Sequence, residues 1–337
     1  MYLKGQHLLS VKQISLELID HLFQVAELMR PFATRQKITR VLEGAVLGNM
    51  FFEPSTRTRV SFGSAFNLLG GQVRETTGMS NSALAKGESL FDTAQVLSGY
   101  SDIICMRHPE SGSVADFATG SRVPVINGGD GANEHPTQAL LDLFTIKNEL
   151  KAQNKDISQL SLTLMGDLKH GRTVHSLCQL LALYKGLKIQ LISPKALAMP
   201  SQYIDLLTNA GHYVTIGEKI EQGLPQANVI YQTRVQEERF ESQQEADLYR
   251  GQYRLNKSIY SQLCQPNSVI MHPLPRDSRS DANELDNDLN NEQGLAIFRQ
   301  TDNGLLVRMA IFACVLGVEE QLQKPQRSVN WFVGLTK

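Results

Sequence analysis

The residues best suited to chemistry gather in one short stretch, Phe51-Phe52-Glu53-Pro54-Ser55-Thr56-Arg57-Thr58-Arg59. An apolar run over residues 45–52 predicts a strand that leads into this stretch. The spacing of Phe62, Phe66 and Leu69 predicts a helix that follows it. The first backbone N–H groups of a helix have no partner within the helix, and the helix dipole is positive there. This junction therefore favours an anion.

The side chains of the same stretch add donors to this junction. Ser55, Thr56 and Thr58 carry hydroxyl groups. Arg57 carries a planar cation that can hold a phosphate through two parallel hydrogen bonds. Taken alone, the pattern fits an ordinary helix cap with solvated arginines equally well. The clusters elsewhere in the chain favour the anion site.

Further donors follow other predicted strands of the first half. Arg107 comes directly after a short buried strand over residues 102–106. His135 and Gln138 open a helix that follows a strand over residues 123–126. In parallel sheets ligands bind beyond the carboxyl ends of the strands, so we expect these side chains to face a common ligand.

The second half repeats the arrangement with a different set of donors. Arg172 opens a helix after a strand over residues 162–165, and Arg234 and Gln236 follow a strand over residues 228–232. Arginine and glutamine donors match carboxylates well. The combined set lacks a nucleophile with its base and a carboxylate cluster for a metal. It suits a site that stabilises negative charge by position, and predicts transfer from a phosphorylated donor to an acidic acceptor.

Strands and helices alternate along the chain, which predicts parallel sheets covered by helices. The fold class is therefore α/β, with two doubly wound parallel-sheet domains joined by interdomain helices. The polar stretch over residues 148–159 predicts a domain boundary. The first domain covers residues 1–148 and is completed by the C-terminal segment 303–337, and the second covers residues 149–302.

Segments outside the site are predicted from the same periodicities. They are an amphipathic helix over 11–30, a loop over 76–88, a helix over 90–97, turn residues over 127–131, strands over 188–192, 213–216 and 268–272, a surface loop over 276–292 and a last helix over 304–322.

The composition excludes several classes of partner. The formal net charge is −1 at pH 7, so no general attraction to nucleic acid or to a membrane is expected. Cys105, Cys178, Cys264 and Cys314 are scattered without a C-x-x-C pair, which favours buried core residues over a disulfide framework or a zinc site. The longest apolar run, over 309–318, is too short to span a bilayer. We expect a cytoplasmic protein.

Six motifs resemble the aspartate/ornithine carbamoyltransferase family. In the first half, the stretch quoted above, Met106-Arg107-His108-Pro109 and His135-Pro136-Thr137-Gln138 resemble its carbamoyl-phosphate signature. In the second half, three motifs are similar to its aspartate branch: Gly166-Asp167-Leu168-Lys169-His170-Gly171-Arg172-Thr173-Val174-His175-Ser176, Thr233-Arg234-Val235-Gln236 and His272-Pro273-Leu274-Pro275-Arg276. The ornithine branch carries a cysteine in the last motif and an S-M-G-type loop, and neither is found here.

The resemblance implies an enzyme that transfers the carbamoyl group of carbamoyl phosphate to the amine of L-aspartate. The products would be N-carbamoyl-L-aspartate and phosphate, in de novo pyrimidine biosynthesis. The amine would add directly to the carbamoyl carbon through a tetrahedral intermediate, without a cofactor or a metal. The residues implied to be catalytic are Arg57, Thr58, Lys86, Arg107 and His135.

The resemblance also implies two sets of substrate-binding residues. Carbamoyl phosphate would contact Ser55, Thr56, Arg57, Thr58, Ser82, Arg107, His135, Gln138, Pro273 and Leu274. Aspartate would contact Lys86, Arg172, Arg234 and Gln236. Within the first set, Thr58, Arg107 and His135 would form an oxyanion hole for the carbamoyl oxygen. Gln138 and the carbonyls of Pro273 and Leu274 would hold the carbamoyl amino group.

The family further implies a homotrimer with shared active sites. Ser82 and Lys86 would come from the neighbouring subunit. The sequence leaves open whether separate regulatory chains join the trimer. The peptide bond before Pro275 is expected to be cis. The tail carrying Trp331-Phe332-Val333 would pack on its own subunit or dock a partner.

Three alternatives stay open at this point. A related enzyme could use another amino acceptor such as ornithine, although a cationic side chain should be repelled by Arg234. A non-catalytic paralogue would normally have lost Arg57, Arg107, His135 or Arg172, and all four are present. A dinucleotide-binding enzyme is disfavoured, because no G-x-G-x-x-G follows the first predicted strands.

Overall fold

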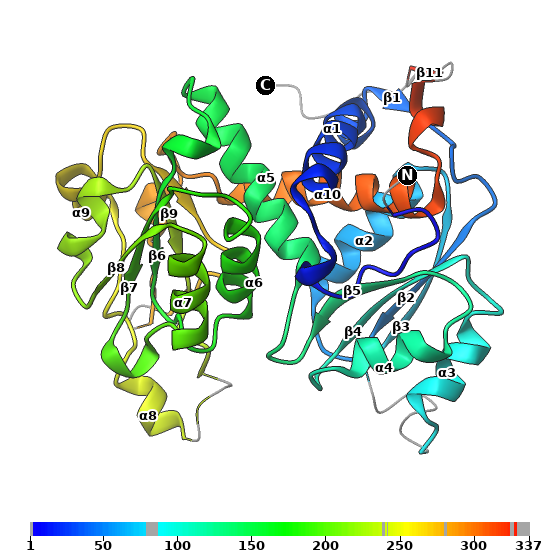
Figure 1. Ribbon diagram of the computed structural model, residues 1–337, viewed down its shortest axis with the longest axis horizontal. Helices are drawn as coiled ribbons and strands as arrows, with labels where there is room; N and C mark the ends of the chain where they lie inside the picture. The colour runs from blue at the N-terminus through cyan, green and yellow to red at the C-terminus, as the bar shows by residue number, and fades with distance from the viewer. Residues whose placement is uncertain are drawn as a thin grey trace. The chain divides into compact units, whose positions relative to one another are not determined.

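The computed structural model describes residues 3–78, 87–237, 240, 242–279, 282–323 and 327–328 (Figure 1). Ser82, Lys86 and the Trp331-Phe332-Val333 segment, which figured in the predictions, lie outside these residues. The chain divides into two compact units. The first combines Met1–Leu141 with Asp302–Lys337, and the second is Asp142–Thr301. Helices α5 (Pro136–Ala152) and α10 (Ile297–Leu316) contribute residues to both units.

The first unit is built on a four-stranded sheet whose strands pair in parallel, in the order β3-β2-β4-β5. These strands are β2 (Val46–Phe51), β3 (Gln72–Thr77), β4 (Ile103–His108) and β5 (Val125–Asp130). Its helices, besides those shared with the second unit, are α1 (Leu16–Ala33), α2 (Thr56–Leu68), α3 (Leu90–Leu97) and α4 (Ser113–Gly120). Smaller elements are the 3-10 turns η1 (Val11–Gln13) and η9 (Glu319–Gln323) and the antiparallel pair β1 (Lys37–Ile38) and β11 (Arg327–Ser328).

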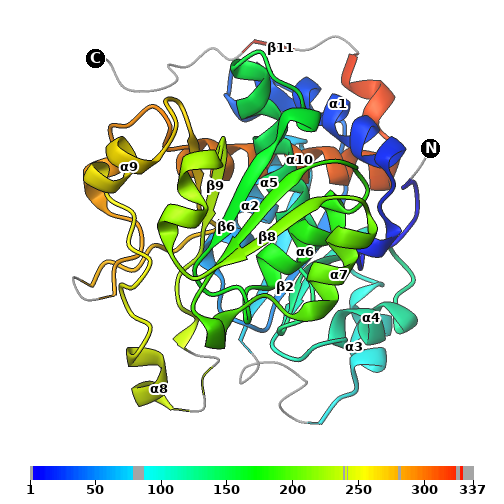
Figure 2. The same cartoon turned by 60° about the vertical axis from the view of Figure 1, so that its left-hand side comes forward.

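The second unit holds a five-stranded parallel sheet in the order β10-β9-β6-β7-β8, which Figure 2 turns toward the viewer. Its strands are β6 (Ser161–Met165), β7 (Lys188–Ile192), β8 (Tyr213–Gly217), β9 (Val229–Gln232) and β10 (Val269–Met271). The α-helices are α6 (Arg172–Leu181), α7 (Ser201–Asn209), α8 (Gln243–Asp247) and α9 (Lys257–Leu263). The 3-10 turns are η3 (Ile157–Gln159), η4 (Lys195–Leu197), η5 (Ile220–Gln222), η6 (Leu224–Gln226) and η8 (Asn287–Leu289).

Both sheets reverse direction once, as doubly wound sheets do. From β2 the chain first moves to β3 at one edge and then returns to β4 on the other side of β2. From β6 it moves outward to β8 and returns to β9 on the other side of β6. The strand order therefore reverses between β2 and β4 and between β6 and β9, and ligands bind at such points. The predicted fold class is confirmed.

Aromatic packing joins the last helix to α2 within the first unit. Phe312 of α10 meets Phe62 and Phe66 of α2 edge to face, with ring centroids 5.9 and 5.0 Å apart. Arg308 of α10 lies 4.9 Å from the Phe62 ring centroid and donates to the Ser61 hydroxyl at 2.8 Å. These contacts hold α2, whose N-terminus carries the predicted phosphate residues, against a buried helix.

Several predicted segments match the structure and others are wrong. The helix over 90–97 and the strand over 188–192 have the predicted bounds. The helix predicted over 11–30 begins only at Leu16, because the Ser15 side chain accepts the Leu18 N–H and caps it there. The last helix begins at Ile297 rather than at 304.

The largest errors concern strands with polar sequences. The loop predicted over 76–88 starts too early, since β3 extends through Thr77 and pairs with β2. The turn predicted over 127–131 is largely wrong, because β5 continues through Asp130 and His108 pairs with it in the register. No helix in the described part of the chain is long and apolar enough to cross a membrane.

Candidate active site

The predicted phosphate residues lie where β2 turns into α2. Ser55 has an extended backbone (φ −162°, ψ 84°), and its side chain makes no hydrogen bond to the end of the helix. Ser55 therefore occupies the N-cap position without the side-chain hydrogen bond of an ordinary cap. Thr56 and Arg57 are exposed, whereas Thr58 is half-buried. This helix end retains the electrostatic preference for an anion that its dipole provides.

Arg107 lies at the end of the neighbouring strand and is fixed by a carboxylate. The residue is 8% exposed, and its Nη2 lies 2.7 Å from Glu53 Oε2. The strand register places Arg107 opposite Phe51, and the Phe52 N–H donates to the Arg107 carbonyl at 2.9 Å. The β2–α2 turn and Arg107 are therefore adjacent, as predicted from their strand ends. The sequence reasoning missed the partner Glu53, which stands within the quoted motif.

Gly129 brings Arg107 and His135 together. A Cβ atom added to Gly129 would lie 3.1 Å from Arg107 Nη1 and 3.5 Å from His135 Cδ2. The glycine also has φ +117°, which L side chains rarely adopt. The two predicted oxyanion residues thus flank one glycine that has no room for a side chain.

A buried carboxylate orders the turn that carries His135. Asp130 is 2% exposed. It accepts the Glu134 N–H at 3.1 Å and the Gly112 N–H at 3.0 Å. His135 follows directly and is 3% exposed, and its carbonyl accepts the Gln138 N–H at 3.0 Å in the first turn of α5. Asp130 therefore links the end of β5 to the position of His135.

The second unit has an equivalent carboxylate at the end of β6. Asp167 is fully buried and accepts the His170 N–H at 3.0 Å and the Gln236 N–H at 3.1 Å. Its Oδ2 also lies 3.1 Å from His170 Nδ1. Asp167 thereby joins the turn after β6 to the segment after β9, across the point where the strand order reverses. The sequence reasoning missed it, although a carboxylate directly after a buried strand is a usable signal.

The same two segments carry the predicted carboxylate-binding residues. Arg172 is the first residue of α6, and Gly171 before it provides no side-chain cap. A Cβ added to Gly171 would lie 3.9 Å from Gln236 Nε2, so the Gln236 amide approaches the start of α6. The structure therefore brings Gln236 close to the turn that bears Arg172.

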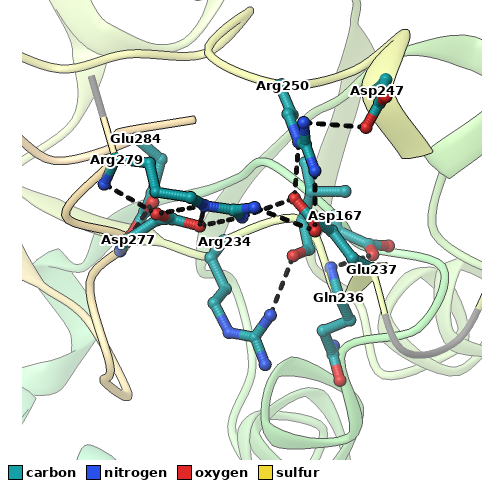
Figure 3. A network of polar contacts seen from close by, with 10 residues as sticks. Asp167, Arg234, Gln236, Glu237, Asp247, Arg250, Asp277, Arg279 and Glu284 are labelled. Atoms are coloured by element: carbon teal, nitrogen blue, oxygen red, sulfur yellow. Dashed lines mark hydrogen bonds and ion pairs between the residues drawn. The ribbon is translucent and has the colours of Figure 1, made fainter. Parts of the chain in front are cut away.

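Figure 3 shows how the arginines around this cluster differ in their partners. Glu237 accepts from Arg250 Nε at 2.7 Å and from Arg279 Nη2 at 2.6 Å, and Asp247 also pairs with Arg250 at 2.9 Å. Arg234 instead donates through Nη1 to the neutral Val235 carbonyl at 3.0 Å. Arg234 therefore has a backbone carbonyl among its partners, whereas carboxylates hold Arg250 and Arg279.

His272 fixes the segment that follows β10. Its Nδ1 accepts the Leu274 N–H at 2.8 Å, and its Nε2 lies 2.8 Å from Glu284 Oε1. An accepting Nδ1 places the ring proton of the neutral imidazole on Nε2. The Leu274–Pro275 peptide bond is cis, as predicted. Pro273 and Leu274, which were expected to offer carbonyls, thus lie in a segment held by a buried histidine.

His175, His272 and the buried cysteines are poor candidates for catalysis by proton or group transfer. Burial lowers the pKa of His175 and His272, so both stay neutral near pH 7. Burial raises the pKa of the Cys178 and Cys314 thiols to about 12. Cys264 was expected in the core but is only half-buried. In the part of the chain that the structure describes, the strand-end donors remain the groups suited to a negatively charged transition state.

Comparison with known proteins agrees with this geometry. Residues 6–148 match the family description "Aspartate/ornithine carbamoyltransferase, carbamoyl-P binding domain", and residues 158–315 match "Aspartate/ornithine carbamoyltransferase, Asp/Orn binding domain". The chain belongs to the aspartate/ornithine carbamoyltransferase family. The family predicted from the six motifs is confirmed.

Individual relatives place it near the aspartate branch. The chain is 64% identical over 332 residues to an aspartate carbamoyltransferase catalytic subunit of Saccharophagus degradans, covering 98% of each chain. It is also 64% identical to the corresponding subunit of Cellvibrio japonicus, covering 99% of each. Among solved structures, aspartate transcarbamoylase of Trypanosoma cruzi in complex with carbamoyl phosphate and aspartate matches with a TM-score of 0.85 and 34% identity, covering 93% of this chain and 98% of that one.

Proposed function

We propose that this chain is an aspartate carbamoyltransferase, which transfers the carbamoyl group of carbamoyl phosphate to the amine of L-aspartate. The observation that carries the proposal is the placement of its donors. Cations and amides stand at the strand-order reversals of both sheets, where doubly wound folds bind ligands. The names of the relatives at 64% identity support the same activity. The activity belongs to de novo pyrimidine synthesis in the cytoplasm.

The first unit holds the phosphorylated donor. The N-terminus of α2 and the side chains of Ser55, Thr56 and Arg57 bind the phosphate. Thr58, Arg107 and His135 surround the carbamoyl oxygen. The close approach of Arg107 and His135 to Gly129 supports this role, because two donors on either side of one glycine can converge on one oxygen.

The second unit supplies the groups for the dicarboxylic acceptor. Arg172 and Gln236 lie on segments that Asp167 joins, and Arg234 donates to the Val235 carbonyl. The planar guanidinium of Arg234 can hold a substrate carboxylate through two parallel hydrogen bonds. The carbonyls of Pro273 and Leu274, with Gln138, bind the carbamoyl amino group.

These residues position the substrates and stabilise charge. The aspartate amine adds to the carbamoyl carbon, and the carbonyl oxygen becomes negative in the tetrahedral intermediate. Arg107, His135 and the Thr58 hydroxyl donate to that oxygen. The C–O bond to phosphate then breaks, and the phosphate takes the proton that the amine loses, so it leaves as the HPO4 dianion. Arg57 with Lys86 stabilises the charge on this leaving group. Loss of one such oxyanion donor typically costs about 3–4 kcal/mol of transition-state stabilisation.

The test is phosphate release by the purified chain from carbamoyl phosphate, with L-aspartate or L-ornithine as the acceptor. We expect release with aspartate and N-carbamoyl-L-aspartate as the product by mass spectrometry. Release that depends on ornithine instead would contradict the roles of Arg234 and Gln236. Release with neither acceptor would contradict the proposed activity.

The proposal includes a homotrimer in which Ser82 and Lys86 complete a neighbour's site. Four large apolar side chains of the first unit support an interface, because each is 48% to 70% exposed: Val60, Phe91, Val96 and Tyr100. If sites are shared, Arg57→Ala and Lys86→Ala chains are each inactive but should restore activity in mixed trimers. Random mixing in equal amounts predicts about a quarter of the wild-type activity per site, since each partner is intact in half the chains. No restored activity after demonstrated subunit exchange would refute the shared site.

A further inference from the structure

Three side chains with metal-binding chemistry converge in the first unit, apart from all the residues assigned above. His21 belongs to α1 and Cys314 to the end of α10, two helices that Figure 1 labels, and Glu319 belongs to η9. One ligand atom from each of the three lies within 4.8 Å of the others. His21 Nε2 is 3.9 Å from Glu319 Oε1. We propose that His21, Cys314 and Glu319 bind a divalent transition-metal ion of the zinc class.

The burial of the carboxylate is the first argument for a cation. Glu319 is 7% exposed, and its Oε2 has no hydrogen-bond partner among the described residues. Within the same part of the chain no lysine or arginine nitrogen lies within 4 Å of this carboxylate, and His21 is its nearest basic group. A buried carboxylate is costly unless a cation or a donor compensates it. A bound metal ion would supply that charge.

The donor set is the second argument. An imidazole nitrogen, a thiol and a carboxylate are the three kinds of ligand that zinc takes in proteins. Zinc bond lengths of about 2.0–2.3 Å place tetrahedral ligand atoms roughly 3.3–3.8 Å apart. The three groups therefore need to close by about 1 Å, which side-chain rotation can provide. The His21 side chain is 31% exposed, but its Nε2, which faces Glu319, is buried, so the ligand atoms lie beneath the surface and a water molecule would take the fourth position.

An ion pair between His21 and Glu319 is the simpler reading, but it leaves Cys314 without a role. Cys314 is 2% exposed and places its sulfur beside both partners. The sequence spacing shows no zinc motif, because α1 and α10 bring together residues from opposite ends of the chain. A metal here would tie the first helix to the last helix of the unit. None of its ligands is a proposed substrate-binding residue, so catalysis should not require it.

Cobalt(II) titration of the full-length, chelator-treated protein tests the site, because cobalt reports its ligands by absorption. We expect one cobalt ion per chain, tetrahedral d–d bands and a thiolate-to-cobalt charge-transfer band, all of which zinc displaces. Binding without the thiolate band, or no saturable binding, would overturn the proposal. Addition of zinc should also raise the Tm of the wild-type protein.

Variants assign the ligands. His21→Ala, Cys314→Ser and Glu319→Gln should each weaken cobalt binding by at least about 100-fold, since even loss of a residue that only orients a ligand costs 10–100-fold. Cys264→Ser is the matched thiol control and should keep both the band and the affinity. Carbamoyl transfer by Cys314→Ser should equal that of the wild type, which separates this test from the proposed function. A band that survives in Cys314→Ser, or disappears in Cys264→Ser, would refute the assignment even if one of the other variants fails to fold.

Discussion

Replacement of Asp167 by alanine should selectively impair the use of aspartate. Asp167 is fully buried, and it accepts the backbone N–H groups of His170 and Gln236 at 3.0 and 3.1 Å. Each N–H left without an acceptor costs about 1–3 kcal/mol, so the free energy of unfolding should fall by roughly 2–6 kcal/mol. Without Asp167, the segment after β9 would lose its link to the turn after β6, and the Gln236 amide would no longer be held in place.

The kinetic effect follows from the hydrogen bond that Gln236 is proposed to make. A hydrogen bond to a charged group contributes about 1.5–3 kcal/mol, which corresponds to roughly a 10- to 150-fold rise in the KM for aspartate. The KM for carbamoyl phosphate should change little. Asp167→Asn keeps one acceptor oxygen but presents an NH2 group to the other N–H, so its effect should lie between wild type and Asp167→Ala.

Asp130→Ala is the matched control. Asp130 is 2% exposed and also accepts two backbone N–H groups, but it lies in the first unit and orders the turn that carries His135. Its removal should raise the KM for carbamoyl phosphate and lower kcat, with a smaller effect on aspartate. Steady-state kinetics with each substrate varied, alongside unfolding by circular dichroism, would measure both variants. An unchanged KM for aspartate in Asp167→Ala, or the same kinetic profile in both variants, would refute the reasoning.

Two further substitutions test other parts of the account. Gly129→Ala would place a Cβ 3.1 Å from Arg107 Nη1, at a residue with φ +117°. We expect kcat to fall by at least about 10-fold. Complete loss of an oxyanion donor would lower kcat by about 10²–10³-fold. Gly44 is the control, because it also has a positive φ but has open space around it. Gly44→Ala should lower the stability of the protein without lowering kcat. Equal kcat values in the two variants would contradict the steric argument. Burial lowers the pKa of His272 despite the opposing effect of Glu284, so below about pH 6.5 the unfolded chain binds a proton that the folded chain does not. The free energy of unfolding should therefore fall as the pH drops from 7.5 to 5.5. In urea unfolding, His272→Gln should reduce the slope of this free energy against pH by up to about 1.4 kcal/mol per pH unit. An identical slope in the wild type and the variant would show that His272 does not titrate in this way.

Local patterns predicted the fold where burial and periodicity agree. The helix Leu90–Leu97 and the strand Lys188–Ile192 have the predicted bounds because each combines a regular apolar pattern with clear flanking residues. The strand Gln72–Thr77 was missed because it lies at the edge of its sheet and is largely exposed, so it has no apolar alternation. The glycines near the end of β5 suggested a turn, but β5 continues through Asp130, with a shift in its register to β4 and a positive φ at Gly129.

The candidate site divides in the same way. Residues that carry charge or hydroxyl groups at strand ends, such as Arg57 and Arg107, could be selected from the sequence because their chemistry is visible in their type. Glu53 and Gly129 could not, because their roles depend on contacts between segments that the chain order does not reveal. Asp167 was missed although it follows a buried strand closely, because its contact with Gln236 is equally hidden in the chain order. The same limit hides the proposed metal site, since spacing along the chain cannot show that α1 and α10 meet.

The central claim is that the first unit binds the phosphorylated donor and the second binds the dicarboxylic acceptor for one reaction. The most direct measurement is the affinity of a bisubstrate analogue, a phosphonate linked to the amine of L-aspartate, by calorimetry. It should bind at least about 100-fold more tightly than phosphonoacetate or succinate alone, because one molecule engages both sets of donors. Arg57→Ala and Arg234→Ala should each remove most of this gain. An analogue that binds no more tightly than its halves, or that loses affinity in only one of the two variants, would contradict the account.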